Sequence, residues 1–132
     1  MNETESGTEK PGDRLESFGI YQAARRLFDE SWEDSEIFGR DYRGKELVRQ
    51  LVRSLGSICA NIEEGYGRGF GKELPHSIRI ARGEARESRG RYERCRFLLP
   101  PETVQHRVAT LSQLIGGLTN TITTLERQRA NP

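Results

Sequence analysis

Apolar residues recur at intervals of three and four along most of the chain, which is the spacing of one face of an α-helix. The pattern predicts four helices, over 17–37, 45–66, 72–99 and 102–128. The last two carry the most regular seams, with heptad spacing from Leu74 to Leu99 and from Val104 to Leu125. Four amphipathic helices with short connections predict an all-α fold, an antiparallel up-down-up-down four-helix bundle.

The seams differ in the size of their residues. The third helix is lean in its middle, with Ala81, Ala85 and Ser88 at successive seam positions. Small residues let neighbouring helices approach closely, so we expect this helix to lie near its partners. The fourth seam is regular enough to suit packing between subunits as well.

The length of 132 residues suits one domain with one core. Residues 1–14 are polar and aperiodic, and they are predicted to form a disordered tail. The bundle domain is expected over 15–129, followed by a short tail over 130–132. We find no secretory signal pattern and no apolar run of membrane-spanning length, which indicates a cytoplasmic protein without membrane contact.

Two cysteines, Cys59 and Cys95, fall within helical patterns and are predicted to be reduced residues of the core. Together with the distant His76 and His106 they do not make a recognisable zinc site. No cofactor loop and no paired-carboxylate site stands out either. The sequence therefore predicts neither a metal nor a cofactor, and we expect a protein that is not an enzyme.

Charge is unevenly distributed, although the net charge is only +1. Residues 1–41 hold 5 basic and 11 acidic residues, whereas residues 42–132 hold 16 basic and 9 acidic ones. This asymmetry suggests opposed surfaces, one of them suited to an anion. An acidic run on the first helix is interpreted as a solvated far face; it comprises Asp29, Glu30, Glu33, Asp34 and Glu36.

A stripe of arginines marks the third predicted helix. Its members step by three, four and three residues and so share one face: Arg79, Arg82, Arg86 and Arg89. Such a stripe is suited to follow a phosphate backbone, with an affinity that falls steeply with salt. It is equally suited to salt bridges, within the chain to Glu84 or Glu87, or between subunits to the acidic first helix. The sequence leaves both interpretations open.

Four glycines between Gly65 and Gly71 separate the second helix from the third. A phosphate-binding P-loop would need a strand before this stretch and Ser or Thr after Lys72, and neither is present. The stretch is better interpreted as a helix cap and turn. It presents Arg68 and Lys72 beside the start of a helix, where backbone amides favour a phosphate group.

A line of polar residues accompanies the apolar stripe of the second helix, namely Ser57, Asn61 and Glu64. Glu87 on the third helix is a candidate partner. A carboxylate and an amide near a core suit catalysis in principle. The interpretation we favour is a structural polar network that fixes the helix register, because an unpaired buried polar group is costly.

The segment from Ser57 to Gly69 reads SICANIEEGYGRG. It resembles the signature S-I-P-A-N-I-A-E-G-Y-G-R-G of the four-helix bundle proteins encoded in intervening sequences of bacterial 23S ribosomal RNA. The segment from Phe18 to Ala24 is similar to the opening motif of that family, and Ile80 to Glu87 is similar to a later one. Cys59 stands where the family has proline, and Glu63 replaces a small residue.

The resemblance implies a four-helix bundle that assembles as a ring-like homopentamer. It also implies relatedness to the accessory protein of diversity-generating retroelements, which forms a basic barrel, binds nucleic acid and works with a reverse transcriptase. With the arginine stripe, it predicts a non-enzymatic oligomer that binds RNA or DNA through Arg side chains. The alternative is an interaction scaffold or an adaptor for a partner such as a reverse transcriptase, with the arginines used in subunit salt bridges.

Overall fold

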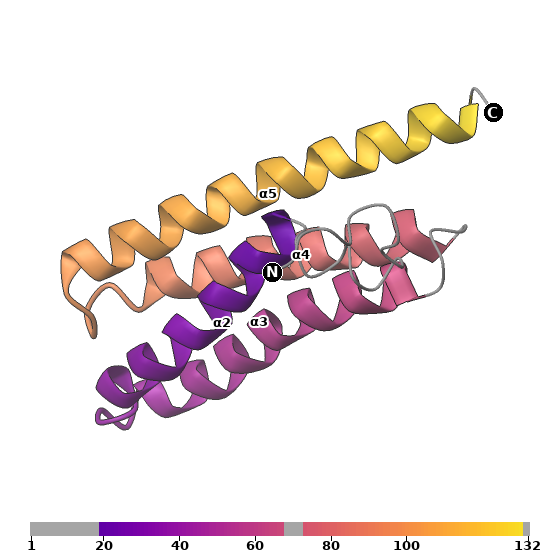
Figure 1. Cartoon of the computed structure of the whole chain (residues 1–132). Helices are drawn as coiled ribbons and strands as arrows, with labels where there is room; N and C mark the ends of the chain where they lie inside the picture. Colours follow the sequence, from indigo (N-terminus) through magenta and orange to yellow (C-terminus); the bar gives the residue numbers. More distant parts are fainter. Residues whose placement is uncertain (1–18, 68–72, 131–132) are drawn as a thin grey trace, which may run out of the picture.

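A computed structural model describes residues 19–67 and 73–130 of the chain (Figure 1). This part forms four helices and no strand: α2 (Gly19–Phe38), α3 (Gly44–Gly67), α4 (Glu73–Arg94) and α5 (Pro101–Ala130). The predicted all-α fold with four helices is confirmed. Arg68, Lys72 and the predicted 1–14 tail lie outside the described residues. Ala130, which was predicted to belong to the 130–132 tail, is part of α5.

The third helix ends earlier than its seam predicts, at Arg94 instead of Leu99. The chain continues as a turn in which the amide of Leu98 donates to the carbonyl of Cys95 at 2.8 Å. The reason lies in the following residues. Pro100 disfavours the helical conformation at Leu99, so the apolar heptad continues through a segment that is no longer helical.

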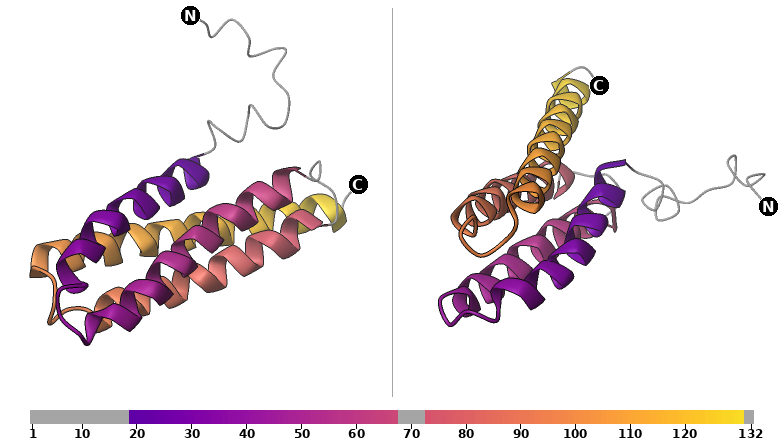
Figure 2. Two further views of the ribbon diagram at one scale, coloured as in Figure 1. Left: turned by 90° about the horizontal axis from the view of Figure 1, so that it is seen from below. Right: turned by 90° about the vertical axis from the view of Figure 1, so that its left-hand side faces the viewer.

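The helices surround a common core so that each has two neighbours (Figure 2). The neighbouring pairs are α2 with α3, α3 with α4, α4 with α5, and α5 with α2, whereas the diagonal pairs make no close backbone contact in the described part. Helix α4 thus lies between α3 and α5. Its predicted seam is buried wherever the structure describes it, at Ile78, Ala81, Ala85, Ser88, Tyr92 and Cys95.

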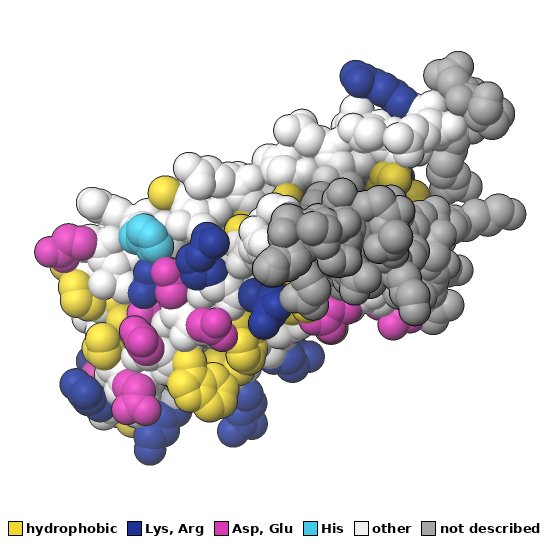
Figure 3. Space-filling view, in the orientation of Figure 1, with side chains coloured by type: hydrophobic (Ala, Val, Ile, Leu, Met, Phe, Trp, Pro, Cys, Tyr) yellow, Lys and Arg dark blue, Asp and Glu magenta, His cyan; other side chains and the backbone are white. Residues whose placement is uncertain are grey.

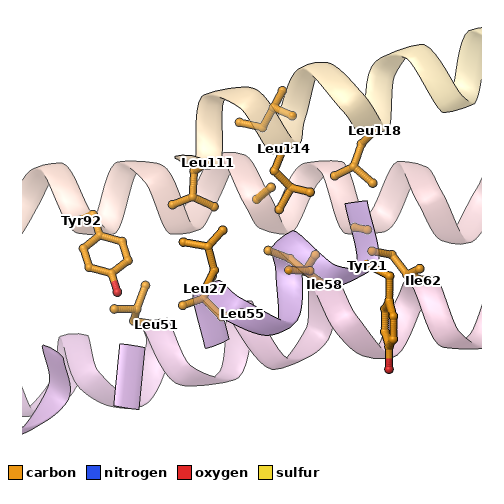
Figure 4. Packing of buried hydrophobic residues seen from close by; sticks show 14 of the residues in the cluster. Tyr21, Leu27, Leu51, Leu55, Ile58, Ile62, Tyr92, Leu111, Leu114 and Leu118 are labelled. Atoms are coloured by element: carbon orange, nitrogen blue, oxygen red, sulfur yellow. The ribbon is translucent and has the colours of Figure 1, made fainter. Parts of the chain in front are cut away.

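Buried side chains from all four helices form one core (Figure 4). Leu27 of α2, Leu55 of α3 and Leu111 of α5 have no exposed surface. Burial of one such side chain contributes about 1.5–3 kcal/mol. The apolar stripes that predicted the helices are therefore also the surfaces that hold them together.

Two glycines lie where another segment of the chain comes close, backbone at Gly44 and a side chain at Gly117. A Cβ atom at Gly44, the first residue of α3, would lie 1.9 Å from the carbonyl oxygen of Phe38, so the turn between α2 and α3 admits only glycine there. The same turn is closed by the amide of Arg43, which donates to Asp41 Oδ1 at 2.8 Å. At Gly117 of α5, a Cβ atom would lie 2.8 Å from Ile20 Cγ2, which lets α2 and α5 meet.

Candidate nucleic-acid interface

The predicted arginine stripe lies along the seam between α4 and α5. Arg82 Nη1 donates to Thr119 Oγ1 at 3.3 Å, and Arg89 Nη1 donates to Ser112 Oγ at 3.2 Å. These partners explain the pattern of the sequence. Seven residues separate the two arginines and seven separate the two hydroxyl residues, in opposite order, because α4 and α5 run antiparallel at this seam.

The other two members of the stripe differ from each other. Arg79 forms an ion pair with Glu126 of α5, and both side chains are about half exposed, at 44% and 51%. Arg86 is exposed and makes no hydrogen bond or ion pair with any residue that the structure describes. The internal pairing considered from the sequence thus occurs at Arg79, but its partner is on α5 and not on α4.

A hydroxyl group holds a guanidinium in place without neutralising its charge. Within the described residues, Arg82, Arg86 and Arg89 therefore keep a positive charge that no carboxylate within ion-pair distance compensates. Hydroxyl groups hold two of these cations in place, and the third, Arg86, is exposed between them. Arginine in this setting favours ligands with phosphate oxygens, which its planar fork matches.

The structure brings together only part of the predicted polar network. Asn61 Nδ2 donates to the carbonyl oxygen of Ser57 at 2.9 Å and to Ser57 Oγ at 3.1 Å, one turn back along α3. Both residues are half-buried, whereas Glu64 is exposed. Glu87 does not join this line in any described contact. It lies 3.6 Å from Arg91 Nη2, one turn further along α4.

Arg91 is the centre of a separate polar contact between α3 and α4. Its Nε donates to Gln50 Oε1 at 3.3 Å, and its Nη1 donates to the buried hydroxyl of Ser54. The side chain is only 14% exposed. These contacts fix the relative position of the two helices, the role that the sequence suggested for Ser57 and Asn61.

A buried ion cluster links three helices, and the sequence interpretation missed it. Asp34 of α2 accepts hydrogen bonds from Arg107 of α5, from Nε at 2.7 Å and from Nη2 at 3.0 Å. The hydroxyl of Tyr92 on α4 donates to Asp34 Oδ2 at 2.6 Å. Glu30 lies 3.4 Å from Arg107 Nη1.

The cluster corrects the interpretation of the acidic run on the first helix as solvated. Asp34 is only 3% exposed, and Glu30 is half-buried. A signal for this burial was present, because Leu27, Ser31, Asp34 and Phe38 continue one heptad stripe. A carboxylate at a core position of a helix needs a cation, and Arg107 supplies it.

The environment of the cluster shifts two pKa values. Burial and the hydrogen bond to Asp34 raise the pKa of Tyr92 well above its ordinary value, so the phenol stays protonated. The hydrogen bond to Asp34 raises the pKa of Arg107. The cluster therefore consists of a neutral donor, a carboxylate and a permanent cation, and has the character of a structural element.

The potential metal ligands and thiols of the described part of the chain are dispersed or buried. It contains no group of three or more His, Cys, Asp or Glu side chains that are placed to hold a metal ion. Cys95 is buried and Cys59 half-buried, and burial raises the pKa of each thiol to about 11. Thiols with such pKa values are weak nucleophiles and weak ligands at neutral pH.

His76 lies on α4 and His106 on α5, and both side chains are exposed, whereas Cys95 is buried and Cys59 half-buried. Arg107 Nη1 lies 2.7 Å from His106 Nδ1.

No helix in 19–67 or 73–130 combines the length and apolar character that crossing a membrane requires.

The chain matches a known protein family. A family model described as 23S rRNA-intervening sequence protein matches residues 16–100, which is more than half of the chain. Searches of curated proteins and of solved structures find no match.

Proposed function

The chain belongs to the family of 23S rRNA-intervening sequence proteins, and on this premise we propose that it is a non-enzymatic, oligomeric helical protein that binds the phosphate backbone of RNA or DNA. Its four helices would form an up-down-up-down bundle, and its subunits a ring-like homopentamer in the bacterial cytoplasm. The antiparallel α4–α5 seam supports the bundle topology. The pentamer rests on the family resemblance.

One observation carries the proposal: three guanidinium groups along the α4–α5 seam have no carboxylate of a described residue within ion-pair distance. Arg82 and Arg89 are held by hydroxyls, and Arg86 lies exposed between them. Arg89 lies seven positions after Arg82, which is about 10 Å along the helix. A polyanion lying along this row would meet several cations in succession.

The mechanism is neutralisation of phosphate charge without reading of bases. Phosphate contacts position a nucleic acid, whereas sequence is read through base edges. The exposed aromatic residues of the described surface, Trp32, Tyr42 and Phe97, lie outside the stripe. A platform for stacking of bases therefore does not accompany these arginines, and the proposed binding is independent of sequence.

A salt-dependent binding titration tests the proposal. The variant Arg82→Gln/Arg86→Gln/Arg89→Gln is compared with wild type on a fluorescent RNA and on a DNA duplex, by anisotropy at several salt concentrations. Each lost phosphate contact should lower the slope of log affinity against log salt by about 0.7–0.9. We expect the triple variant to bind about tenfold or more weakly at low salt.

The matched control removes three exposed arginines that lie outside the stripe, as Arg26→Gln/Arg40→Gln/Arg94→Gln. It changes the net charge equally, so it should retain most of the affinity and slope if position matters. Wild type that does not bind at low salt would contradict the proposal. If both triple variants lose the same affinity, binding is a nonspecific attraction to the positive charge of the protein and not a property of the stripe.

A second candidate function is a protein-interaction scaffold, or an adaptor for a partner such as a reverse transcriptase. It is favoured by a specific observation: Trp32, a large apolar side chain on α2, is 63% exposed. Exposed tryptophan is typical of protein contact sites. Co-purification that recovers a stoichiometric protein but no nucleic acid would support this candidate over the first.

A further inference from the structure

A hollow lies at the end of the bundle that carries the 39–43 and 95–100 connections. It has a volume of about 200 Å³. Its lining consists of one phenylalanine, two leucines and two arginines: Phe97, Leu47, Leu98, Arg43 and Arg94. In Figure 3, hydrophobic side chains reach the surface among charged ones at the left-hand end, where Figure 1 draws these connections. This Phe97 hollow combines aromatic and apolar surface with positive charge.

The lining differs in charge from two other hollows, which lie between α2 and α3. One of about 530 Å³ includes Glu36, and one of about 280 Å³ includes Asp29 and Glu63, so carboxylates stand beside the arginines there. Among the described residues, no acidic side chain lines the Phe97 hollow. An anionic ligand is therefore favoured at the Phe97 hollow over the other two.

The two arginines of the Phe97 hollow differ in how far their charge is compensated. Arg43 bonds both carboxylate oxygens of Asp41, through Nε at 2.9 Å and through Nη2 at 2.7 Å. Arg94 is exposed and makes no hydrogen bond or ion pair with any residue that the structure describes. Arg94 is thus the cation of the hollow that is available to a ligand.

Phe97 supplies the aromatic surface. Its side chain is 79% exposed, and the guanidinium of Arg96 lies over the ring, 4.4 Å from the centroid. Arg96 Nη1 also donates to the carbonyl oxygen of Glu93 at 3.0 Å, which helps to hold the guanidinium there. A ring has two faces, and Arg96 covers one of them. Unpaired bases bind to proteins by stacking on such rings, with arginines beside them.

The backbone that carries Phe97 is held by its neighbours on both sides. Cys95 is fully buried, and Leu99 is 5% exposed. Between them, the amide of Leu98 donates to the carbonyl of Cys95 at 2.8 Å. A platform that is fixed before the ligand arrives loses little conformational entropy on binding.

We propose that the Phe97 hollow binds an unpaired nucleotide of RNA or DNA, with the base stacked on Phe97 and its phosphate beside Arg94. A nucleotide is the ligand that combines a flat aromatic ring with an anion, as the lining does. Every base has a face that can stack, so this contact is also independent of sequence. The bases of a duplex stack on each other, so the hollow selects single-stranded segments.

The inference deepens the proposed function and rests on it for the identity of the ligand. Arg89 is the last arginine of the stripe, and Arg96 follows seven positions later, just past the end of α4. A strand whose phosphates follow the stripe toward this end of the bundle reaches Phe97 with its next nucleotides. The stripe then binds backbone, and the hollow binds a base that is not paired.

Titrations of the full chain with a single strand and with a duplex separate the hollow from the stripe. Fluorescent oligothymidylate and a blunt-ended DNA duplex are titrated with wild type, Phe97→Ala and Phe97→Tyr. Phe97→Ala should weaken single-strand binding about fivefold or more, because one stacked base is lost, and should leave duplex binding unchanged. Phe97→Tyr keeps an aromatic ring and should bind as wild type.

Tyr42 provides the matched control. It is 80% exposed at the same end of the bundle, with the guanidinium of Arg43 at 5.8 Å from its ring centroid, but it does not line the hollow. Tyr42→Ala should therefore bind the single strand as wild type does. A loss equal to that of Phe97→Ala would overturn the assignment of the base to the hollow.

Arg94→Gln tests the contact to phosphate. It should lower the slope of log single-strand affinity against log salt by about 0.7 and leave the duplex slope unchanged. For this reason, the comparison of the stripe variant with its control, which includes Arg94→Gln, is decided on the DNA duplex. An unchanged single-strand slope would remove Arg94 from the site.

A tryptophan at position 97 reports stacking directly. The variant Trp32→Phe/Phe97→Trp has its single tryptophan there, because Trp32 is the only one of the natural chain. The single strand should quench its emission to a saturating level, and the duplex should not. Trp32→Phe alone, which has no tryptophan, gives the background signal.

Failure of this inference and failure of the proposed function give different results. If Phe97→Ala binds the single strand as tightly as wild type, or if single strand and duplex quench equally, the hollow is not a nucleotide site, whereas duplex binding still supports the stripe. If wild type binds the single strand through Phe97 but does not bind the duplex, the site holds and the stripe fails. Wild type that binds neither overturns both. Circular dichroism of each variant establishes that the helices are intact.

Discussion

Arginine occupies two contrasting environments in this bundle. The side chain of Arg107 is 13% exposed and bonds both carboxylate oxygens of Asp34, with Tyr92 completing the cluster. Arg82 and Arg89 lie at the α4–α5 surface and, among the described residues, bond only the hydroxyls of Thr119 and Ser112. The first guanidinium is fully committed within the chain, whereas the other two keep their charge for a ligand.

The difference follows from solvation. A charge taken out of water must be paired, and removal of one partner leaves the other uncompensated. A charge at the surface is screened by water and contributes little to stability, whichever group it contacts. Buried and exposed arginines should therefore respond oppositely to substitution: one set determines whether the bundle is stable, the other whether it binds.

The largest effect is expected at the buried carboxylate. Asp34→Asn keeps the shape of the side chain but removes the charge opposite Arg107. We expect a loss of about 3–5 kcal/mol in the free energy of unfolding, measured by urea denaturation at neutral pH. The control Asp29→Asn, on the exposed side of the same helix, should change stability by less than about 0.5 kcal/mol. If Asp34→Asn and Asp29→Asn lose similar free energies of unfolding, the contrast between buried and exposed charges is wrong.

A smaller effect is expected at Tyr92. Tyr92→Phe removes the donor to Asp34 but leaves the ion pair, and a hydrogen bond to a charged group contributes about 1.5–3 kcal/mol. Chemical denaturation measures the loss. Tyr42→Phe serves as the control, because Tyr42 is 80% exposed and its substitution should be nearly neutral.

The contribution of Tyr92 to stability should also depend on pH in the alkaline range. The raised pKa of Tyr92 means that the folded chain holds the phenolic proton after an unfolded tyrosine, with a pKa near 10, has released it. Its contribution to stability is complete below about pH 10 and is lost progressively as the pH rises above that value. The thiols of Cys59 and Cys95 act in the same direction, so the difference between wild type and Tyr92→Phe isolates the tyrosine.

The smallest effect is expected at the exposed pair of Arg79 and Glu126. Arg79→Gln should cost about 0–1 kcal/mol, and less as salt is added. Arg86→Gln provides the reference, because Arg86 makes no hydrogen bond or ion pair with a described residue. A loss at Arg79 as large as that at Asp34 would show that the stripe is structural and would weaken its assignment to a ligand.

The sequence carries most of the fold, for a clear physical reason. The heptad seams of α4 and α5 reflect burial wherever the structure describes it, and burial determines how these helices pack. The end of α4 was harder to predict, because the apolar spacing continues through the turn at Cys95 to Leu98 and only Pro100 indicates the break. Periodicity reports which side chains are buried, and it does not report the backbone conformation directly.

The polar contacts were harder to predict from the sequence than the helices. Arg79, Arg82, Arg86 and Arg89 could be grouped from spacing alone, but their partners on α5 depend on the relative axial position of two helices. Asp34 was assigned to the solvated face by its charge, although its heptad position argued for burial. Its partner Arg107 lies 73 residues away, and no local pattern joins the two.

The position of the ion cluster makes the bundle mechanically asymmetric. Asp34 lies near the end of α2, Tyr92 near the end of α4 and Arg107 near the start of α5, so all three are at the end of the bundle that carries the 39–43 and 95–100 connections. The cluster therefore holds three helices together at that end. Thermal opening should start at the opposite end, where α5 runs on to Ala130, and the helical turns around the cluster should be the last to lose amide protection against hydrogen exchange.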